Sequence, residues 1–277
     1  MIVSKRSSLL NAHILAVMEN EWAQLIRNRV VVFTTTVPTV LLVALGVSAL
    51  LFTSLLELDH ETLTKAAGGL LQGVPGADEI IFQGADQVKA TLLSPFLVLF
   101  QSIPLVVPIT IASYSIVGEK QQRSLEPLLA TPIKTWELLV AKALSAAIPG
   151  VLSTWWGFAL FILAGRFFAS EDIYNRLLIS PAWLLAIVLL APLFTLCAVG
   201  LGIIISSRAK DPNSAQQLGS LLILPVIALL IAQVSGAVHV GVTLILGIAF
   251  GVGLLDAILL VAGVRLFRRE EILTGWK

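Results

Sequence analysis

Residues 30–56 read VVVFTTTVPTVLLVALGVSALLFTSLL and contain no charged side chain. About 20 consecutive apolar residues are enough for a helix to cross the hydrocarbon core of a bilayer, which is about 30 Å thick. Only helices and closed barrels satisfy their own backbone hydrogen bonds in lipid. This stretch therefore predicts a membrane-spanning helix.

Five further stretches show the same pattern, and only the last of them contains a charged residue. They are residues 92–117, 143–165, 182–205, 218–238 and 240–264. The whole chain is 57% hydrophobic and 13% charged, whereas soluble domains are nearer one half and one quarter. Its mean hydropathy is +0.94. The short alternating segments of a membrane β-barrel are absent, so the sequence predicts an all-α polytopic membrane protein with six transmembrane helices.

The six predicted spans divide the chain into a cytoplasmic N-terminal segment (1–29), a transmembrane domain (30–264) and a cytoplasmic tail (265–277). In the N-terminal segment, residues 14–29 read ILAVMENEWAQLIRNR. One helical face of this stretch is apolar, and Glu19, Glu21, Gln24 and Arg27 lie off it. The apolar positions are Ile14, Met18, Trp22, Leu25 and Ile26. We expect an amphipathic helix in the membrane interface, as an anchor or as an element that senses a partner's movement.

Basic residues are divided unequally between the two sides of the predicted membrane. The two end segments and the loops 118–142 and 206–217 hold 14 of the 18 Lys and Arg residues. The loops 57–91 and 166–181 hold the other four. Because basic residues near span ends are retained in the cytoplasm, we expect a multi-pass protein of the cell (inner) membrane. Both termini are then cytoplasmic, and 57–91 is an external loop.

The sequence contains no motif for catalysis or for metal binding. A phosphate loop of the form GxxxxGK[ST] is absent, and so is the zinc motif HExxH. His13, His60 and His239 lie in three different segments, and Cys197 is the only cysteine. We therefore expect a chain that is not an enzyme by itself and that holds no cofactor or metal.

Two polar features of the spans are candidates for a substrate pathway. Thr35 and Thr39 belong to the threonine-rich stretch TTTVPT of the first span. Their hydroxyls can bond to a carbonyl one turn earlier or can line a pathway. Asp256 is the one charged residue within a predicted span, and a carboxylate there is costly. It should face the interior of the bundle or be protonated, with either a structural role or a role in transport.

The loop 118–142 begins with GEKQQRSLEPLLATP between the second and third spans. Ser124 is a good N-cap, and Pro127 is tolerated in the first turn of a helix. Leu125, Leu128 and Leu129 would form an apolar ridge among charges. Such a ridge either folds back onto the bilayer surface or binds a partner. A second helix should run through Trp136 and Lys142 into the third span.

Residues 117–142, VGEKQQRSLEPLLATPIKTWELLVAK, resemble the signature of ABC-2 type transporter permeases. The shared features are a Glu after span two, a basic residue four positions later, Leu-Glu, a Leu pair, Thr-Pro and a Lys that leads into span three. The six-span plan is similar too. So are Glu21, Arg27 and Arg29 before the first span and the tail LFRREEILTGWK, although both ends are weaker support than the central motif.

The resemblance implies an ATP-driven transporter, most often an exporter, in which two permeases pair as a homo- or heterodimer. Each permease would rest on a separate ATPase subunit, which binds ATP and Mg. The coupling helix of this family docks in that ATPase, and by position its contacts would be Glu119, Arg123, Leu125, Glu126, Leu128 and Leu129. Pro127 departs from the commoner family pattern, which leaves the start of this helix open. No nucleic-acid partner is implied, and the cargo is not readable.

Two other classes of protein compete with this interpretation. A secondary transporter or channel would need ionisable groups within the spans, and the sequence offers mainly Asp256 for ion coupling. An intramembrane enzyme would need a catalytic constellation, which the sequence lacks. An ATPase gene beside this one would favour the ABC-2 interpretation.

Overall fold

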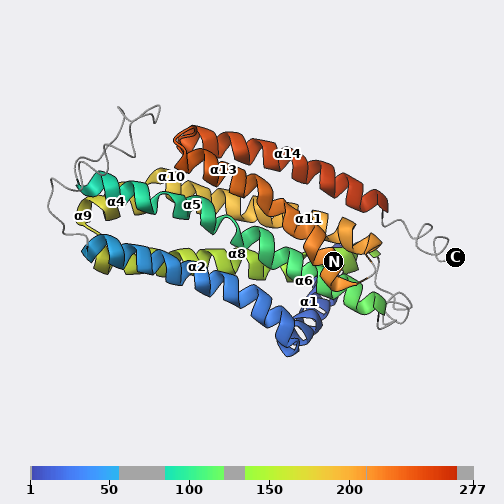
Figure 1. The fold of residues 1–277 in the computed structure, drawn as a ribbon. Helices are drawn as coiled ribbons and strands as arrows, with labels where there is room; N and C mark the ends of the chain where they lie inside the picture. The colour runs from blue at the N-terminus through green and yellow to red at the C-terminus, as the bar shows by residue number, and fades with distance from the viewer. Residues whose placement is uncertain (1, 56–84, 122–134, 210, 267–277) are drawn as a thin grey trace.

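The structure, a computed structural model, describes residues 2–55, 85–121, 135–209 and 211–266. These residues form helices joined by short turns, and none of them lies in a β-strand (Figure 1). In chain order the elements are α1 (Ile2–Arg27), α2 (Arg29–Leu55), α4 (Ala85–Leu93), α5 (Pro95–Phe100), α6 (Ile103–Gln121), α8 (Thr135–Phe168), α9 (Glu171–Ile173), the π-helix η2 (Tyr174–Leu178), α10 (Pro181–Leu185), the π-helix η3 (Ala186–Leu190), α11 (Ala191–Arg208), α12 (Pro212–Ser220), the 3-10 helix η4 (Leu221–Ile223), α13 (Leu224–Val234) and α14 (Val242–Leu266).

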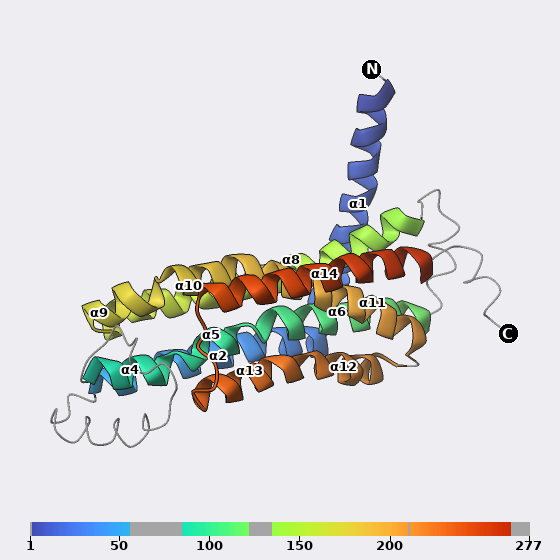
Figure 2. The ribbon, with the colours of Figure 1, turned by 90° about the horizontal axis from the view of Figure 1, so that it is seen from above.

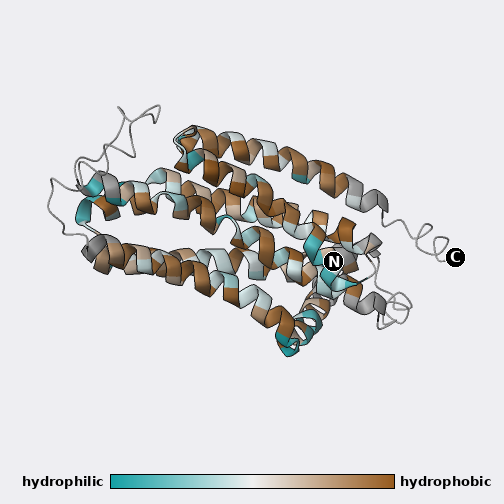
Figure 3. Ribbon diagram, in the orientation of Figure 1, coloured by the Kyte–Doolittle hydropathy of each residue, from teal (hydrophilic) through white to brown (hydrophobic). Residues whose placement is uncertain are grey.

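Six of the described helical stretches are long and apolar enough to cross a membrane. They are Arg29–Phe52, Lys89–Ser115, Val140–Phe168, Pro181–Ser206, Pro212–Val234 and Val242–Val261. Each overlaps one of the six predicted spans, so the all-helical, six-span prediction is confirmed. Hydrophobic residues cover most of the length of the bundle, and hydrophilic residues gather at its two ends and on α1 (Figure 3).

Helix α1 crosses the direction of the long helices instead of joining them (Figure 2). The change of direction occurs at Asn28, which belongs to neither α1 nor α2. The side-chain Oδ1 of Asn28 accepts a hydrogen bond of 3.1 Å from the backbone N–H of Val30. An asparagine that accepts from an N–H of the first turn is a helix N-cap. Asn28 therefore starts α2 at the point where α1 has ended.

Helix α6 lies at the centre of the bundle and packs against α2, α8, α11 and α12. Two breaks divide the second span, one between α4 and α5 and one between α5 and α6. Pro95 is the first residue after the first break, and Pro104 is the second residue after the second break. Proline lacks the backbone N–H that a helix interior needs. The two breaks in the second span therefore lie beside prolines, while Pro108 remains inside α6.

The π-helix η3 lies in the first half of the fourth span, and no pattern in the sequence marks it. Two side chains from neighbouring spans bond to its carbonyls. The Nε2 of Gln101 donates to the carbonyl of Ala186 at 3.1 Å, and the Nε1 of Trp155 donates to that of Ile187 at 3.2 Å. A π-helix has i→i+5 backbone hydrogen bonds in place of the i→i+4 bonds of an α-helix. These two bonds tie the second and third spans to the irregular turn.

The fifth span begins earlier than its predicted start at residue 218, because α12 begins at Pro212. The side chain of Asp211 accepts from the backbone N–H of Ser214 at 2.8 Å and from its hydroxyl at 2.5 Å. Together these bonds hold the pKa of Asp211 below its usual range, with the hydroxyl bond as the larger cause. The stretch DPNS therefore carries an N-cap followed by a proline at the first helical position, which the apolar-run criterion missed.

Aromatic rings fill the core where α2, α5, α8 and α10 meet. Neighbouring ring centroids lie 5.4–6.1 Å apart, which is the usual range for aromatic pairs. The rings belong to Phe96, Phe100, Phe158, Phe161 and Trp183. Gly46 of α2 allows close approach, since a Cβ there would lie 2.8 Å from the ring of Phe161.

The sixth span, in α14, packs mainly on α11. The turn that precedes it contains Gly236, whose φ of 73° lies in the left-handed region that glycine tolerates. The sequence predicts a small-residue packing face at Gly247 and Gly251 in this span. A Cβ at either position would meet no atom within 4 Å, so this face makes no helix contact within the described part of the chain.

Candidate functional site

The segment predicted to couple the chain to a partner lies between α6 and α8. Helix α6 runs to Gln121, so Glu119 is in its last turn, and α8 starts at Thr135. The other predicted contact residues lie outside the described residues; they are Arg123, Leu125, Glu126, Leu128 and Leu129. The prediction of a continuous helix through Trp136 and Lys142 into the third span is confirmed by α8.

Three polar side chains from three helices meet beside this segment. Lys142 of α8 forms an ion pair with Glu21 of α1. Ser115 of α6 accepts a hydrogen bond from the Nζ of Lys142 at 3.0 Å and donates one to the Oε2 of Glu21 at 2.6 Å. The side chains of Lys142 and Glu21 are only 5% and 6% exposed. We call Glu21, Ser115 and Lys142 the three-residue network.

A neighbouring contact extends the attachment of α1 by one turn of α8. The indole Nε1 of Trp22 donates to the carbonyl of Ser145 at 3.1 Å. Met18 is buried on the same side of α1, and Leu25 packs against the main hydrophobic core. Helix α1 therefore holds α8 through adjacent polar contacts at Lys142 and Ser145.

The structure corrects the predicted face of α1 at two positions. Ile26 was expected on the apolar face and is 74% exposed, whereas Glu21 was expected off that face and is buried. Met18, Glu21 and Leu25 are spaced three and four residues apart, which places them on one side of a helix. The apolar criterion excluded Glu21 because it is charged. The sequence did carry a signal for this pair. Glu21 shares the helical spacing of the apolar residues Met18 and Leu25, and Lys142 stands at the start of the apolar third span.

Burial determines what the ion pair contributes. Removing one partner of a buried pair costs about 3–5 kcal/mol because the other charge is left uncompensated. Replacing both partners by apolar residues of similar volume is often neutral. Lys142 and Glu21 therefore define how α1 sits on α8 more than they add to the net stability of the bundle.

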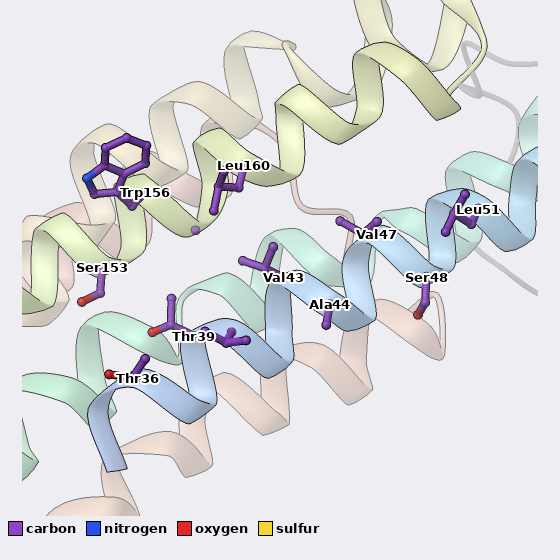
Figure 4. Close-up of a pocket in the computed structure, with 12 residues that line it drawn as sticks. Thr36, Thr39, Val43, Ala44, Val47, Ser48, Leu51, Ser153, Trp156 and Leu160 are labelled. Carbon is purple, nitrogen blue, oxygen red and sulfur yellow. The ribbon is translucent and has the colours of Figure 1, made fainter. Parts of the chain in front are cut away.

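A second feature is a groove of about 560 Å³ between α2 and α8 (Figure 4). This volume lies in the range of about 300–1,000 Å³ that is usual for ligand pockets. Apolar side chains dominate the groove, with hydroxyls from Thr36, Thr39, Ser48 and Ser153. The apolar lining consists of Val40, Val43, Ala44, Val47, Leu51, Trp156, Gly157 and Leu160.

The threonines of the first span divide into two groups. The hydroxyls of Thr34 and Thr35 bond back to the carbonyls of Val30 and Val31, each at 2.8 Å. Thr39 makes a longer bond of 3.3 Å to the carbonyl of Thr35. Thr39 lines the groove and Thr35 does not. The back-bonding alternative therefore describes Thr35 well, while Thr39 also contacts the groove.

Asp256 lies on the side of α14 that is buried against the bundle, as predicted, and is 7% exposed. Neither of its carboxylate oxygens has a hydrogen-bond partner among the described residues. Cys197 of α11 lies within electrostatic range of Asp256. Asp256 is remote in sequence from both the three-residue network and the groove, and it is not among the residues that line the groove.

Among the described residues, no group of three or more His, Cys, Asp or Glu side chains is placed to hold a metal ion. The described residues provide a helix, α1, that is held on α8 by buried polar contacts, a mostly apolar groove between two spans, and one buried carboxylate in the sixth span. These features can form a path through a membrane and allow the helices around it to move.

Comparison with known proteins agrees with this plan. The family described as ABC-2 family transporter protein matches residues 15–247. The match includes the three-residue network and the groove, and it ends before Asp256. No curated protein and no solved structure matches the chain. The chain belongs to the ABC-2 family of transporter proteins and is a membrane permease of that class.

Proposed function

We propose that this chain is the permease subunit of an ATP-driven exporter, and that a separate ATPase subunit supplies the energy. The membership of residues 15–247 in the ABC-2 transporter family carries this proposal. The 277 residues contain no GxxxxGK[ST] phosphate loop, so ATP and Mg would bind to the partner. Alternating access of the spans would then follow ATP binding and hydrolysis in that subunit.

The partner would dock on the segment 118–142. This segment joins the central helix α6 to α8, so a force applied there acts on two packed spans at once. Its sequence offers an apolar ridge of Leu125, Leu128 and Leu129, flanked by Glu119, Arg123 and Glu126. A buried apolar anchor with charged neighbours is the usual composition of a binding hot spot and its rim.

The orientation of the chain in the cell membrane follows from the same segment. Helix α1, the end of α6, the start of α8 and the end of α14 lie at one end of the bundle (Figure 1, Figure 2). The sequence segments that these helices border, together with the loop 206–217, carry 14 of the 18 Lys and Arg residues. We assign this end to the cytoplasm, together with both termini.

The groove between α2 and α8 is our candidate for cargo contact, with Thr39 as its polar determinant and Thr35 behind it. Its mostly apolar lining suits an apolar or amphipathic cargo better than a polyanion. A second permease, either another copy or a paralogue, would complete the transporter as a homo- or heterodimer.

Co-expression of the chain with each ABC ATPase whose gene neighbours that of the chain tests the proposal. The two proteins should co-purify in detergent, and the complex should hydrolyse ATP when Mg is present. The chain purified alone should show no hydrolysis. Robust ATP hydrolysis by the isolated chain, or failure of every neighbouring ATPase to bind it, would contradict the proposed function.

A second candidate function is ion-coupled transport, and Asp256 is the observation that favours it. A buried carboxylate without a hydrogen-bond partner among the described residues can take up a cation or a proton. In proteoliposomes without ATP, an imposed ion gradient should then drive transport in the wild type and not in Asp256→Asn. Transport that requires ATP and persists in Asp256→Asn would exclude this alternative.

A further inference from the structure

We propose that Glu21 and Lys142 are positioning residues that transmit movement of the segment 118–142 to α1 and then to α2. The inference rests on the proposed function, because it assumes that a partner moves this segment. It concerns a different part of the chain from the docking ridge. The ridge would receive the force, and the three-residue network would pass it on.

The first step of the argument is the position of the network along the chain. Ser115 lies three residues before the segment begins, and Lys142 is its last residue. Both side chains bond to Glu21, one to each carboxylate oxygen. Any displacement of α6 relative to α8 at the base of this segment must therefore move Glu21 or break one of these bonds.

The second step is the burial of the network. A solvated ion pair would exchange its partners with water at little cost. Glu21 and Lys142 are almost fully buried, and a buried charge that loses its partner is strongly disfavoured. Opening the network would leave the Glu21 carboxylate buried without Lys142, so the closed arrangement, in which α1 follows α8, is favoured. A buried ion pair therefore passes a movement of α8 on to α1. An apolar contact would instead let the two helices slide past one another.

The third step is what α1 is joined to. The bond from Trp22 to the carbonyl of Ser145 repeats the attachment one turn further along α8. Beyond Arg27 only Asn28 separates α1 from α2, and it caps α2. A shift of α1 therefore acts directly on the first turn of α2.

The final step connects this path to the groove. Helix α2 forms one wall of the groove and α8 forms the other (Figure 4). Lys142 and Ser153 both belong to α8, and Asn28 lies two turns before Thr36 on the other wall. The ion pair thus joins α8 to α1, and α1 leads into α2 through Asn28. A change at the segment 118–142 then changes the spacing or tilt between the two walls.

Limited trypsin digestion reports the position of α1 without knowledge of the cargo. Arg27 and Arg29 are exposed at the corner between α1 and α2, and cleavage there is scored by mass spectrometry of the released fragments. In the isolated chain, Glu21→Gln should be cut about tenfold faster than the wild type, since local opening controls such cleavage. Glu19→Gln, an exposed glutamate on the same helix, should match the wild type.

The same assay in the complex with the ATPase tests transmission. In the wild type, Mg-ATP should change the rate of cleavage at Arg27 and Arg29. In Glu21→Gln, a change on α1 and outside the docking segment, the partner should stay bound and hydrolyse ATP, while Mg-ATP no longer changes the cleavage rate. The charge swap Glu21→Lys with Lys142→Glu should restore the response, which a merely structural role would not require.

Each outcome has a defined meaning. A nucleotide response in Glu21→Gln equal to that of the wild type would overturn the inference, and so would loss of the ATPase from this variant. If the wild-type chain binds no ATPase, the proposed function fails instead. The digestion of the isolated chain still tests whether the three-residue network holds α1 in place, and equal cleavage of Glu21→Gln and the wild type would contradict this.

Discussion

Gly150 of α8 lies directly against Pro108 of α6, because a Cβ at Gly150 would come within 2.5 Å of the Cγ of that proline. The proline ring is rigid and α6 is the central helix of the bundle, so neither side can yield easily. The close contact of the second and third spans at this point therefore depends on the missing side chain of Gly150.

Gly150→Ala should destabilise the chain, since overpacking of a tight core contact costs about 1–3 kcal/mol. For a chain of this size, each kcal/mol corresponds to a shift of about 2–4 °C in melting temperature. The melting temperature of the purified chain in detergent measures the effect. Gly247→Ala is the matched control, because a Cβ there meets no atom within 4 Å. Equal melting temperatures for the two variants would show that α6 and α8 move apart without cost to admit the added methyl group.

The cap at Asp211 should make the start of the fifth span sensitive to pH. The bonds from Ser214 lower the pKa of Asp211 in the folded chain. A lowered folded-state pKa contributes stability above the ordinary carboxyl pKa of about 3.9 and loses it as the pH falls through the folded value. Asp211→Ala should therefore lower the melting temperature at pH 7, with a difference that shrinks below about pH 4.

Asp211→Asn retains an N-cap acceptor and should lie between Asp211→Ala and the wild type at pH 7. A difference between Asp211→Ala and wild type that stays constant from pH 7 to pH 3 would exclude the ionised carboxylate as the cause. The helix that depends on this cap is tied to α6, because Gln216 donates to the Thr110 hydroxyl at 3.1 Å.

Thr39 and Thr35 form a matched pair for the groove. Thr39 lines it, and Thr35 lies one turn away with its hydroxyl bonded to Val31. Valine keeps the shape of threonine and removes the hydroxyl. Thr39→Val should therefore change which compounds stimulate ATP hydrolysis by the complex, and Thr35→Val should not. The same stimulation profile in Thr39→Val and wild type would remove the groove from the cargo path.

The sequence was sufficient for the six spans, because each needs only a long apolar run that charge would interrupt. It was not sufficient for features that depend on pairing between distant residues. Nothing next to Gln101 in the sequence marks Ala186 as its partner, and nothing near Glu21 marks Lys142. Span boundaries also shifted where a polar cap such as Asp211 extends a helix beyond its apolar part.

The candidate site was predicted unevenly for the same reason. Asp256 was found because an isolated charge is conspicuous in an apolar span. Thr39 was found within a cluster whose members only the structure separates, through their different carbonyl bonds. The docking residues from Arg123 to Leu129 were predicted from the resemblance, and they stay a prediction.

The measurement that tests the account most directly is co-purification of the ATPase with the variant Leu128→Ala and Leu129→Ala. Each buried CH₂ is worth about 0.8 kcal/mol, so the double truncation removes a few kcal/mol of binding free energy, and every 1.4 kcal/mol weakens binding about tenfold. Leu254→Ala with Leu255→Ala, two exposed leucines of α14, is the control for lost apolar surface. We expect the first variant to insert normally and lose the ATPase, while the control keeps it. Retention of the ATPase at wild-type levels by the Leu128 and Leu129 variant would contradict the assignment of this segment as the coupling helix.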